Sequence, residues 1–372
     1  MNFYDVLLAA KNGGAPSLTS WYDIRTLVRQ GKAPKYINIG DQFECKRRND
    51  TIVWDNIGFN QDVPAESGYT NVITFCTHQT FDDLPFEPKQ ALFVFEDGLE
   101  AGTYYFTVGA QPWVAGDVNK IITFTLETAI PASGQLVINN AYNATMIGAT
   151  ISSYASPSAT LATETVAMSE AGESPTGINL GTINNAINSN INSIQRALLG
   201  SNNWENSVIR QWLNSEKAAG AWWSARTMWD RVPSWASTKA GFLNGMDSDF
   251  LSCIKPVKKK TALNTVTDGG GYVETIDRVF LLSRTEVYGG NENNIAEGQP
   301  YSYFKDFSTL TAPGPGADAN RIKYENASAK RWWLRSPYSP TAYNTRYVTP
   351  SGDLYYYGAY RSDGVVPACC IY

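Results

Sequence analysis

Tryptophan is concentrated in the second half of this 372-residue chain, and that limits how the chain can fold. Eight of its 11 tryptophans follow residue 200. Residues 264–330 are rich in Gly, Asn and Pro, and one clear strand, Val279–Leu282, interrupts them. Because loops supply little apolar mass, large rings must fill the core of such a domain, and loops on a rigid core often carry function. The eight are Trp204, Trp212, Trp222, Trp223, Trp229, Trp235, Trp332 and Trp333.

Charge and hydropathy exclude two classes of protein. The formal net charge is −5, and the longest basic run, Lys258–Lys260, is typical of a solvated turn, so no nucleic-acid partner is expected. No apolar stretch approaches the ~18–20 residues of a membrane span. The first five residues lack the basic and apolar regions of a secretory signal. We therefore expect neither a membrane span nor a signal peptide.

The cysteines indicate a chain made in a reducing cytoplasm. They are odd in number and scattered, which does not fit a disulfide framework. Cys76 and His78 lack the further partners that a metal site needs, so a buried thiol and a surface histidine are expected there. No metal and no other cofactor is expected. The five are Cys45, Cys76, Cys253, Cys369 and Cys370.

Periodicity indicates an α+β fold with a helical start followed by a β-rich domain. Residues 1–34 form a helical segment in two pieces, Phe3–Ala10 and a second piece with helically spaced Trp21, Ile24, Leu27 and Val28. Residues 35–165 hold short strands separated by turn signals, as in a β-sandwich or barrel. The clearest strands are Leu92–Phe95, Gly102–Val108, Ile121–Leu126 and Gln135–Ile138.

A linker and a second domain complete the predicted organisation. Residues 166–182 are the predicted linker, at the end of a Ser-, Ala- and Thr-rich stretch, and residues 183–372 form the second domain. An apolar stripe with helical spacing opens that domain and ends at Gly200. It could pack on its own domain or against copies of itself in an oligomer. The stripe is Ile183, Ile187, Ile191, Ile194 and Leu198.

Three short motifs carry the most specific information. In order, they are Trp204-x-x-Ser207-x-Ile209-Arg210-x-Trp212-Leu213-Asn214, Trp332-Trp333-Leu334-Arg335-Ser336-Pro337 and Gly364-Val365-x-Pro367-Ala368. Together they resemble C-type-lectin-fold domains of the formylglycine-generating-enzyme type, in the version found in variable proteins of diversity-generating retroelements. The resemblance covers about residues 180–372. Residues 1–165 are similar to N-terminal regions joined to such domains in prophage-borne proteins. Val366 stands where the family usually has an arginine, which puts a core salt bridge in doubt.

The tail can be interpreted without any family. Eight of the 21 tyrosines lie between Tyr338 and Tyr372. The consecutive Tyr355, Tyr356 and Tyr357 cannot all face one core, because side chains alternate along a strand. Tyrosine mixed with small polar residues is the composition of antibody combining sites, where Tyr gives rigid contact area. The tail is therefore either a binding surface or a tyrosine-rich edge without a partner.

The resemblance implies which tail residues bind and which support. Adenine-directed mutagenesis in that family turns Asn-type codons into Tyr, Asp, Ser and Thr, among others, on the exposed face of the fold. The ligand-binding residues expected in this way are Thr341, Tyr343, Asn344, Tyr347, Thr349, Asp353, Tyr355, Tyr356, Tyr357, Tyr360, Arg361 and Ser362. The scaffold residues expected are Trp204, Trp212, Trp332, Trp333, Val348, Leu354 and Pro367.

The resulting hypothesis is a hypervariable receptor-binding protein that is not an enzyme. Its ligand would be a bacterial surface protein or glycan, contacted by residues 338–363. The N-terminal region would dock it, as a homo-oligomer, onto phage or prophage tail proteins, so that it is found in the virion or, before assembly, in the host cytoplasm. One alternative is a structural virion protein without a ligand. The other is an oxidase like the formylglycine-generating relatives, using Cys369 and Cys370, although no histidine lies in this domain. Calcium-dependent sugar binding is not expected, because acidic residues are sparse in the tail.

Overall fold

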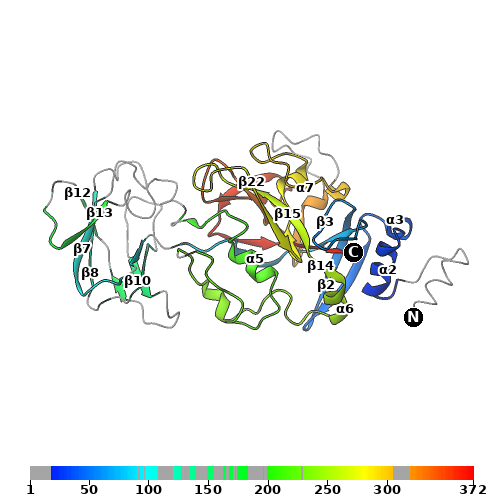
Figure 1. Cartoon of the computed structure of the whole chain (residues 1–372), viewed down its shortest axis with the longest axis horizontal. Coiled ribbons are helices and arrows are strands. Elements are labelled where there is room, and N and C mark those ends of the chain that lie inside the picture. The colour runs from blue at the N-terminus through cyan, green and yellow to red at the C-terminus, as the bar shows by residue number, and fades with distance from the viewer. Residues whose placement is uncertain are drawn as a thin grey trace, which may run out of the picture.

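The computed structural model shows a sheet-rich α+β protein (Figure 1). It describes residues 18–90, 93–95, 97–107, 120–126, 129, 132, 134–138, 149–153, 162–164, 167–170, 172, 174–182, 196, 199–227, 229–304 and 319–372.

The described chain opens with the expected second helical piece, α2 (Trp21–Arg29). A capping box starts the helix, because Ser20 accepts from the Asp23 backbone N–H while the Asp23 carboxylate accepts from that of Ser20. The apolar stripe is buried as its spacing predicts, and α3 (Ala33–Tyr36) follows. The other predicted piece, Phe3–Ala10, lies outside the described residues.

A six-stranded sheet joins the two ends of the described chain. Its strands follow the order β1-β2-β4-β24-β14, and β17 also pairs with β24. The last strand of the chain thus lies antiparallel to β4, with Cys369 opposite Phe75. The strands are β1 (Gln42–Arg47), β2 (Asp50–Phe59), β4 (Ile73–Thr77), β14 (Ile254–Lys255), β17 (Val279–Leu281) and β24 (Pro367–Ile371).

A five-stranded sheet carries the tail, in the order β22-β21-β20-β23-β5. Its strands are β5 (Phe81–Pro85), β20 (Trp332–Pro337), β21 (Asn344–Val348), β22 (Leu354–Gly358) and β23 (Ser362–Val365). Smaller sheets are formed by β3 (Val63–Pro64), β15 (Val257–Ala262) and β16 (Tyr272–Asp277), and by β18 (Lys323–Glu325) and β19 (Ser328–Lys330).

Residues 93–182 add two four-stranded sheets, drawn at the left of Figure 1 away from the other strands. The four predicted strands of this region are confirmed as β6, β7, β8 and β9. The orders are β11-β10-β9-β6 and β12-β8-β7-β13. The bounds are β6 (Phe93–Phe95), β7 (Gly102–Thr107), β8 (Lys120–Leu126), β9 (Gly134–Ile138), β10 (Ala149–Ser153), β11 (Ala162–Glu164), β12 (Ala167–Glu170) and β13 (Ile178–Thr182).

This arrangement differs from the predicted domain division. Residues 35–85 do not belong with the strands that follow them, because β1, β2, β4 and β5 pair within the sheets of the C-terminal half. Residues 166–182 are not only a linker, because β12 pairs with β8 and β13 runs parallel to β7. Residues 93–182 are therefore an insertion between two parts of one sheet-rich unit. The predicted helix from Ile183 to Leu198 lies almost entirely outside the described residues.

Large rings fill the core, as the tryptophan content predicts. Trp54, Trp204, Trp212, Trp332 and Trp333 are among the largest fully buried side chains. The helices around these tryptophans are short. Among the described residues, no helix is long and apolar enough to cross a membrane. The remaining elements are α5 (Val208–Leu213), η2 (Ser234–Ser237), α6 (Ser248–Cys253), α7 (Arg284–Tyr288), η3 (Ser302–Phe304) and η5 (Ala319–Arg321).

Candidate binding surface

The tyrosine-rich tail lies on a sheet that its tryptophans anchor to the core. On β20, Trp332 donates its indole N–H to the Arg321 carbonyl and Trp333 donates to the Leu84 carbonyl, each over 2.9 Å. β20 pairs with β21, and β21 pairs antiparallel with β22 along its whole length. β22 is the edge strand of this sheet, so a rigid support presents its side chains.

A closed set of hydrogen bonds fixes the turn between β21 and β22. The Thr349 backbone N–H donates to the Asp353 carbonyl, and the Asp353 N–H donates to Thr349 Oγ1. Ser351 donates to the Asp353 carboxylate over 2.8 Å, and Tyr288 of α7 donates its hydroxyl to the Gly352 carbonyl. Thr349 and Asp353, both expected to bind ligand, therefore have a role in shaping the turn.

Two tyrosines of β22 point into solvent. Tyr355 is 50% exposed and Tyr357 is 43% exposed, whereas Tyr356 between them is half-buried, as strand alternation requires. Beside them on β21, the buried Tyr347 is paired with Tyr355, and its ring lies edge-on to Trp333 at 6.1 Å and to Tyr355 at 6.0 Å. Tyr347 thus connects the exposed Tyr355 ring to the buried tryptophan.

A charged group lies beside these tyrosines at the start of β23. The Arg361 guanidinium lies 4.6 Å from the centre of the Tyr357 ring and 3.6 Å from the Asp363 carboxylate. Arg331 approaches the same carboxylate at 3.9 Å. Neither distance is short enough for a hydrogen bond, and Asp363 Oδ2 is buried without a partner in the structure. The two guanidiniums and this carboxylate therefore retain hydrogen-bonding capacity.

Burial governs the charge of Asp363. It raises the pKa of this carboxyl to about 6, although Arg361 and Arg331 oppose the increase. Gly364, in the third sequence motif, lets the strands meet here, because a Cβ on it would lie 2.7 Å from the Arg331 carbonyl oxygen. Its own N–H donates to that oxygen over 3.0 Å. The glycine thus sets the distance between Asp363 and Arg331.

Tyr356 belongs to a second, ordered group of side chains, and its ring also stacks on that of Tyr355 with ring centres 5.2 Å apart. Tyr338 and Tyr356 stack with ring centres 3.8 Å apart, and the Arg346 guanidinium lies 4.7 Å from the Tyr338 ring centre. Arg346 also donates to the buried Glu292 carboxylate over 2.8 Å. Because its partners are provided internally, this group stabilises the hairpin.

The structure divides the predicted ligand-binding residues into two groups. Asn344 and Tyr347 are buried, so the expectation that they face a ligand is wrong. Tyr347 packs edge-on against Trp333. The exposed or half-buried residues are Thr341, Tyr343, Thr349, Asp353, Tyr355, Tyr356, Tyr357, Tyr360, Arg361 and Ser362.

Sequence reasoning missed Arg331 and Asp363. A signal for Asp363 existed, since it lies only two residues after Arg361, which directly precedes β23. Arg331 could not have been found, because only the parallel pairing of Trp332 with Gly364 brings it near.

The predicted scaffold residues all pack inward. Six are buried, and Leu354 is partly buried against the same core. Val366 is fully buried, and the core contains an arginine pair, Arg335 with Glu286.

A buried ionic cluster lies in the described core around Lys259. Lys259 bridges Asp62 at 2.6 Å and Glu286 at 2.5 Å, and Glu286 in turn binds Arg335. Burial raises the pKa of nearby Glu297 to about 7, against the effect of Arg335. Burial is the largest single influence on Asp62 and acts in the same direction, but Lys259 and the hydroxyls of Thr74 and Tyr301 together lower the pKa to about 2.

A pocket of about 290 Å³ lies over this cluster, with Asp62, Lys259 and Glu297 among its lining residues. Perturbed carboxyls beside a pocket are a feature of active sites. Here, however, each charged group is committed to an internal partner: Lys259 and Arg335 to carboxylates, and Glu297 to the Ala262 N–H and Ser336. The arrangement is that of a structural network.

The cysteines considered for oxidative chemistry are fully buried. Burial raises the pKa of both Cys369 and Cys370 well above the ordinary value. Cys370 Sγ lies 3.3 Å from the Asp62 carboxylate, which further disfavours a thiolate. As expected, the Cys76 thiol is buried and His78 is exposed, beside Asp55 at 3.0 Å.

The comparisons with known proteins give a family without an assigned function. The model of DUF6273, described as a domain of unknown function, matches residues 178–372, and the chain belongs to this family. No curated protein and no solved structure matches the chain. The family match begins at the first residue of β13, the last strand of the insertion, and includes the whole tyrosine-rich tail.

Proposed function

We propose that this protein is a hypervariable receptor-binding protein. Its C-terminal part would have a C-type-lectin fold of the formylglycine-generating-enzyme type and would be diversified by a retroelement. The ligand would be a bacterial surface protein or glycan, and the N-terminal region would dock the chain onto a phage or prophage tail.

One observation carries the proposal: Tyr355 and Tyr357 are exposed on an edge strand whose underside is locked to the core. Large exposed rings on a rigid support are unfavourable for a protein without a partner, and they are the preferred anchors of binding sites. Arg361 lies against the Tyr357 ring, and Arg331 and Arg361 both approach Asp363, whose buried Oδ2 has no hydrogen-bond partner in the described structure. We define these five residues as the tyrosine face.

The two alternatives lack comparable support. An oxidase would need an accessible thiolate, and Cys369 and Cys370 are fully buried with raised pKa values. A structural virion protein would not need to expose Tyr355 and Tyr357.

The test is binding of the labelled full-length chain to a panel of intact bacterial strains, measured by flow cytometry. We expect saturable binding to at least one strain. The double substitution Tyr355→Ser/Tyr357→Ser should weaken it at least tenfold, which is the size of effect expected for central aromatic anchors. Tyr272→Ser is the matched control, because Tyr272 is 54% exposed but lies on β16. Absence of binding across the panel, or equal loss in the control, would contradict the proposal.

A further inference from the structure

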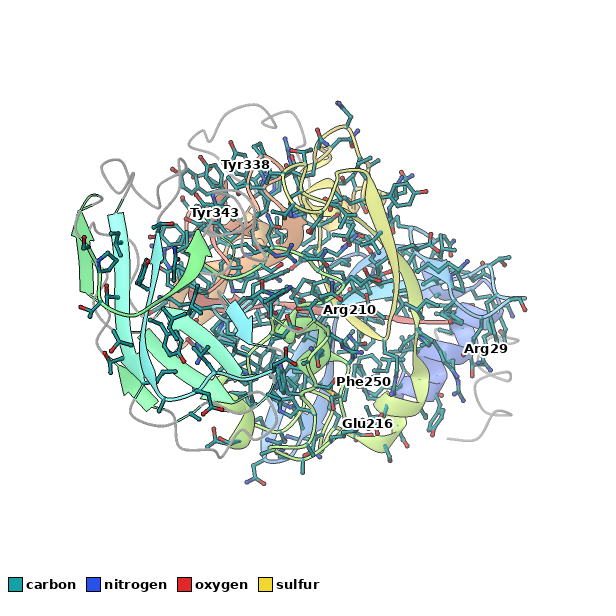
Figure 2. The ribbon with its side chains drawn as sticks, turned by 60° about the vertical axis from the view of Figure 1, so that its left-hand side comes forward. Arg29, Arg210, Glu216, Phe250, Tyr338 and Tyr343 are labelled. Carbon is teal, nitrogen blue, oxygen red and sulfur yellow. The ribbon has the colours of Figure 1, made fainter. Side chains whose placement is uncertain are left out.

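A second pocket, of about 220 Å³, lies between the end of α5 and strand β16. Its lining includes Arg210, Gln211, Lys217, Arg226 and Asp277. Figure 2 shows Arg210 well apart from Tyr338 and Tyr343, so this pocket is separate from the tyrosine-rich tail. The two therefore require separate explanations.

The one acidic residue of the lining, Asp277, is already neutralised. Its Oδ1 accepts from Arg210 Nε over 2.6 Å. Its Oδ2 accepts from the Thr275 hydroxyl over 2.6 Å and from the Trp204 indole over 3.2 Å. Arg210 also donates to the carbonyls of Glu205 and Ile276. The Arg210–Asp277 pair therefore adds no net charge to the pocket.

Two further cations of the lining have no such partner. Lys217 and Arg226 form no ion pair within the described part of the chain, and both are exposed. The nearest carboxylate in sequence, Glu216, is committed to Arg278 at 2.6 Å. The pocket thus carries an excess of two positive charges on a protein whose net charge is −5. Such a local reversal of sign concentrates anions.

A buried hydrogen-bond donor lies in the same wall. Gln211 is 8% exposed, and its Oε1 accepts from the Ser224 backbone N–H over 3.0 Å. That bond fixes which end of the amide is oxygen, so the Nε2 group is the one left without an acceptor. A buried donor without an acceptor is unfavourable and is explained by a missing partner.

We propose that this pocket binds a small organic carboxylate. Lys217 and Arg226 would neutralise its charge, and Gln211 Nε2 would donate to one of its oxygens. The Trp222 ring and the Ile276 side chain supply apolar wall for its carbon skeleton. The volume suits a ligand of a few carbon atoms or a single sugar acid. The carboxylate could belong to an aliphatic acid or to an acidic sugar.

The test uses two carboxylates and their neutral counterparts with the full-length chain at low ionic strength, measured by calorimetry. The probes are succinate against succinamide, and glucuronate against glucose. We expect saturable binding of at least one carboxylate, weakened by added salt, and no binding of its neutral counterpart. Succinate binding would show that the carboxylate suffices, whereas glucuronate binding alone would assign the site to an acidic sugar.

Substitutions locate the binding within the molecule. Lys217→Gln/Arg226→Gln removes two exposed charges and should weaken binding at least tenfold. Lys32→Gln/Lys35→Gln makes the same charge change at α3 and should leave the affinity within twofold. Gln211→Glu, which puts a carboxylate in place of the unpaired donor, should abolish binding. The inference is overturned by no saturable binding of either acid, by equal binding of the neutral compounds, or by equal loss in the control.

Discussion

The Arg335 guanidinium holds the Glu286 carboxylate through two parallel hydrogen bonds, of 2.5 Å and 3.0 Å, where neither side chain reaches solvent. This pair joins β20, which begins with the paired tryptophans, to α7, whose capping box also uses Glu286. Lys259 connects the pair to Asp62, which directly precedes β3. The pair thus links the support of the tyrosine face to the middle of the chain.

Removing one partner of that pair should be costly. Arg335→Leu leaves Glu286 and Glu297 buried without their guanidinium, and we expect a loss of about 3–5 kcal/mol in the free energy of unfolding. Lys258→Leu breaks an exposed pair with Glu274 at 3.9 Å and should cost less than about 1 kcal/mol. Urea unfolding followed by tryptophan fluorescence measures both. Equal effects would mean that the buried pair has no special role.

Glu297 should make stability depend on pH between about 4.5 and 7. Its pKa is about 7 in the folded protein, against an ordinary value of 4.5, so folding favours the protonated form. The stabilisation of the folded protein by protonated Glu297 is fully present below pH 4.5. It is lost as the pH rises from 4.5 to 7, and it does not return above pH 7. The difference of about 2.5 units corresponds to roughly 3 kcal/mol.

The isosteric Glu297→Gln isolates this effect. The amide keeps an oxygen for the Ala262 N–H and cannot ionise. Relative to the unmodified protein, this variant should gain stability as the pH rises from 4.5 to 7, and the gain should then level off. Glu274→Gln, at an exposed carboxyl, should show no such gain. A difference that does not change with pH would argue that Glu297 is ionised throughout.

Gly364→Ala should disturb the tyrosine face without touching its side chains. The added Cβ would meet the Arg331 carbonyl oxygen at 2.7 Å and Thr80 Cβ at 3.0 Å, and backbone cannot yield as a flexible side chain does. We expect a loss of about 1–3 kcal/mol in stability, the usual cost of overpacking. Ser362→Ala, at the exposed neighbour, should change stability by less than about 0.5 kcal/mol. Thermal unfolding of the two variants measures both changes in stability, and equal changes would contradict the prediction.

The five thiols should be unreactive in the folded protein. All five cysteines are buried and free, and burial raises the pKa of Cys45 and of Cys76 to about 12. Titration with a chromogenic disulfide at pH 7 should therefore give little reaction in native buffer and five thiols after denaturation. One rapidly reacting thiol in the native protein, traced to Cys369 or Cys370, would instead favour the oxidase.

Local patterns in the sequence predicted the local features well. The stripe of α2, the strands β6 to β9 and the burial of the motif tryptophans each depend on residues close together in the chain. The alternation along Tyr355–Tyr357 likewise depends only on strand geometry. Features of this kind can be predicted without knowing which distant segments of the chain pair in the fold.

The domain division failed because it depends on contacts between distant residues. The pairing of β4 with β24 joins residues almost 300 positions apart, and no composition change marks it. The same limit applies to the tyrosine face, since Arg331 meets Asp363 only through the pairing of β20 with β23. Tyr347 was assigned to the surface because composition alone does not show which side of β21 is covered.

Burial within the tail predicts which codons vary if a retroelement diversifies this gene. Tyr355, Tyr357, Arg361 and Ser362 can change without opening the core, because each is exposed or half-buried. Tyr347 is 6% exposed against Trp333, and its replacement by a small polar residue would leave a cavity costing about 3–5 kcal/mol. Deep sequencing of the codons for residues 338–363 in a population should show adenine-site changes at the first four positions. Changes at 347 should be rarer and limited to large residues, and the codons for Trp332, Trp333 and Val348 should stay constant. Variation spread evenly along the gene would remove the retroelement from the proposal.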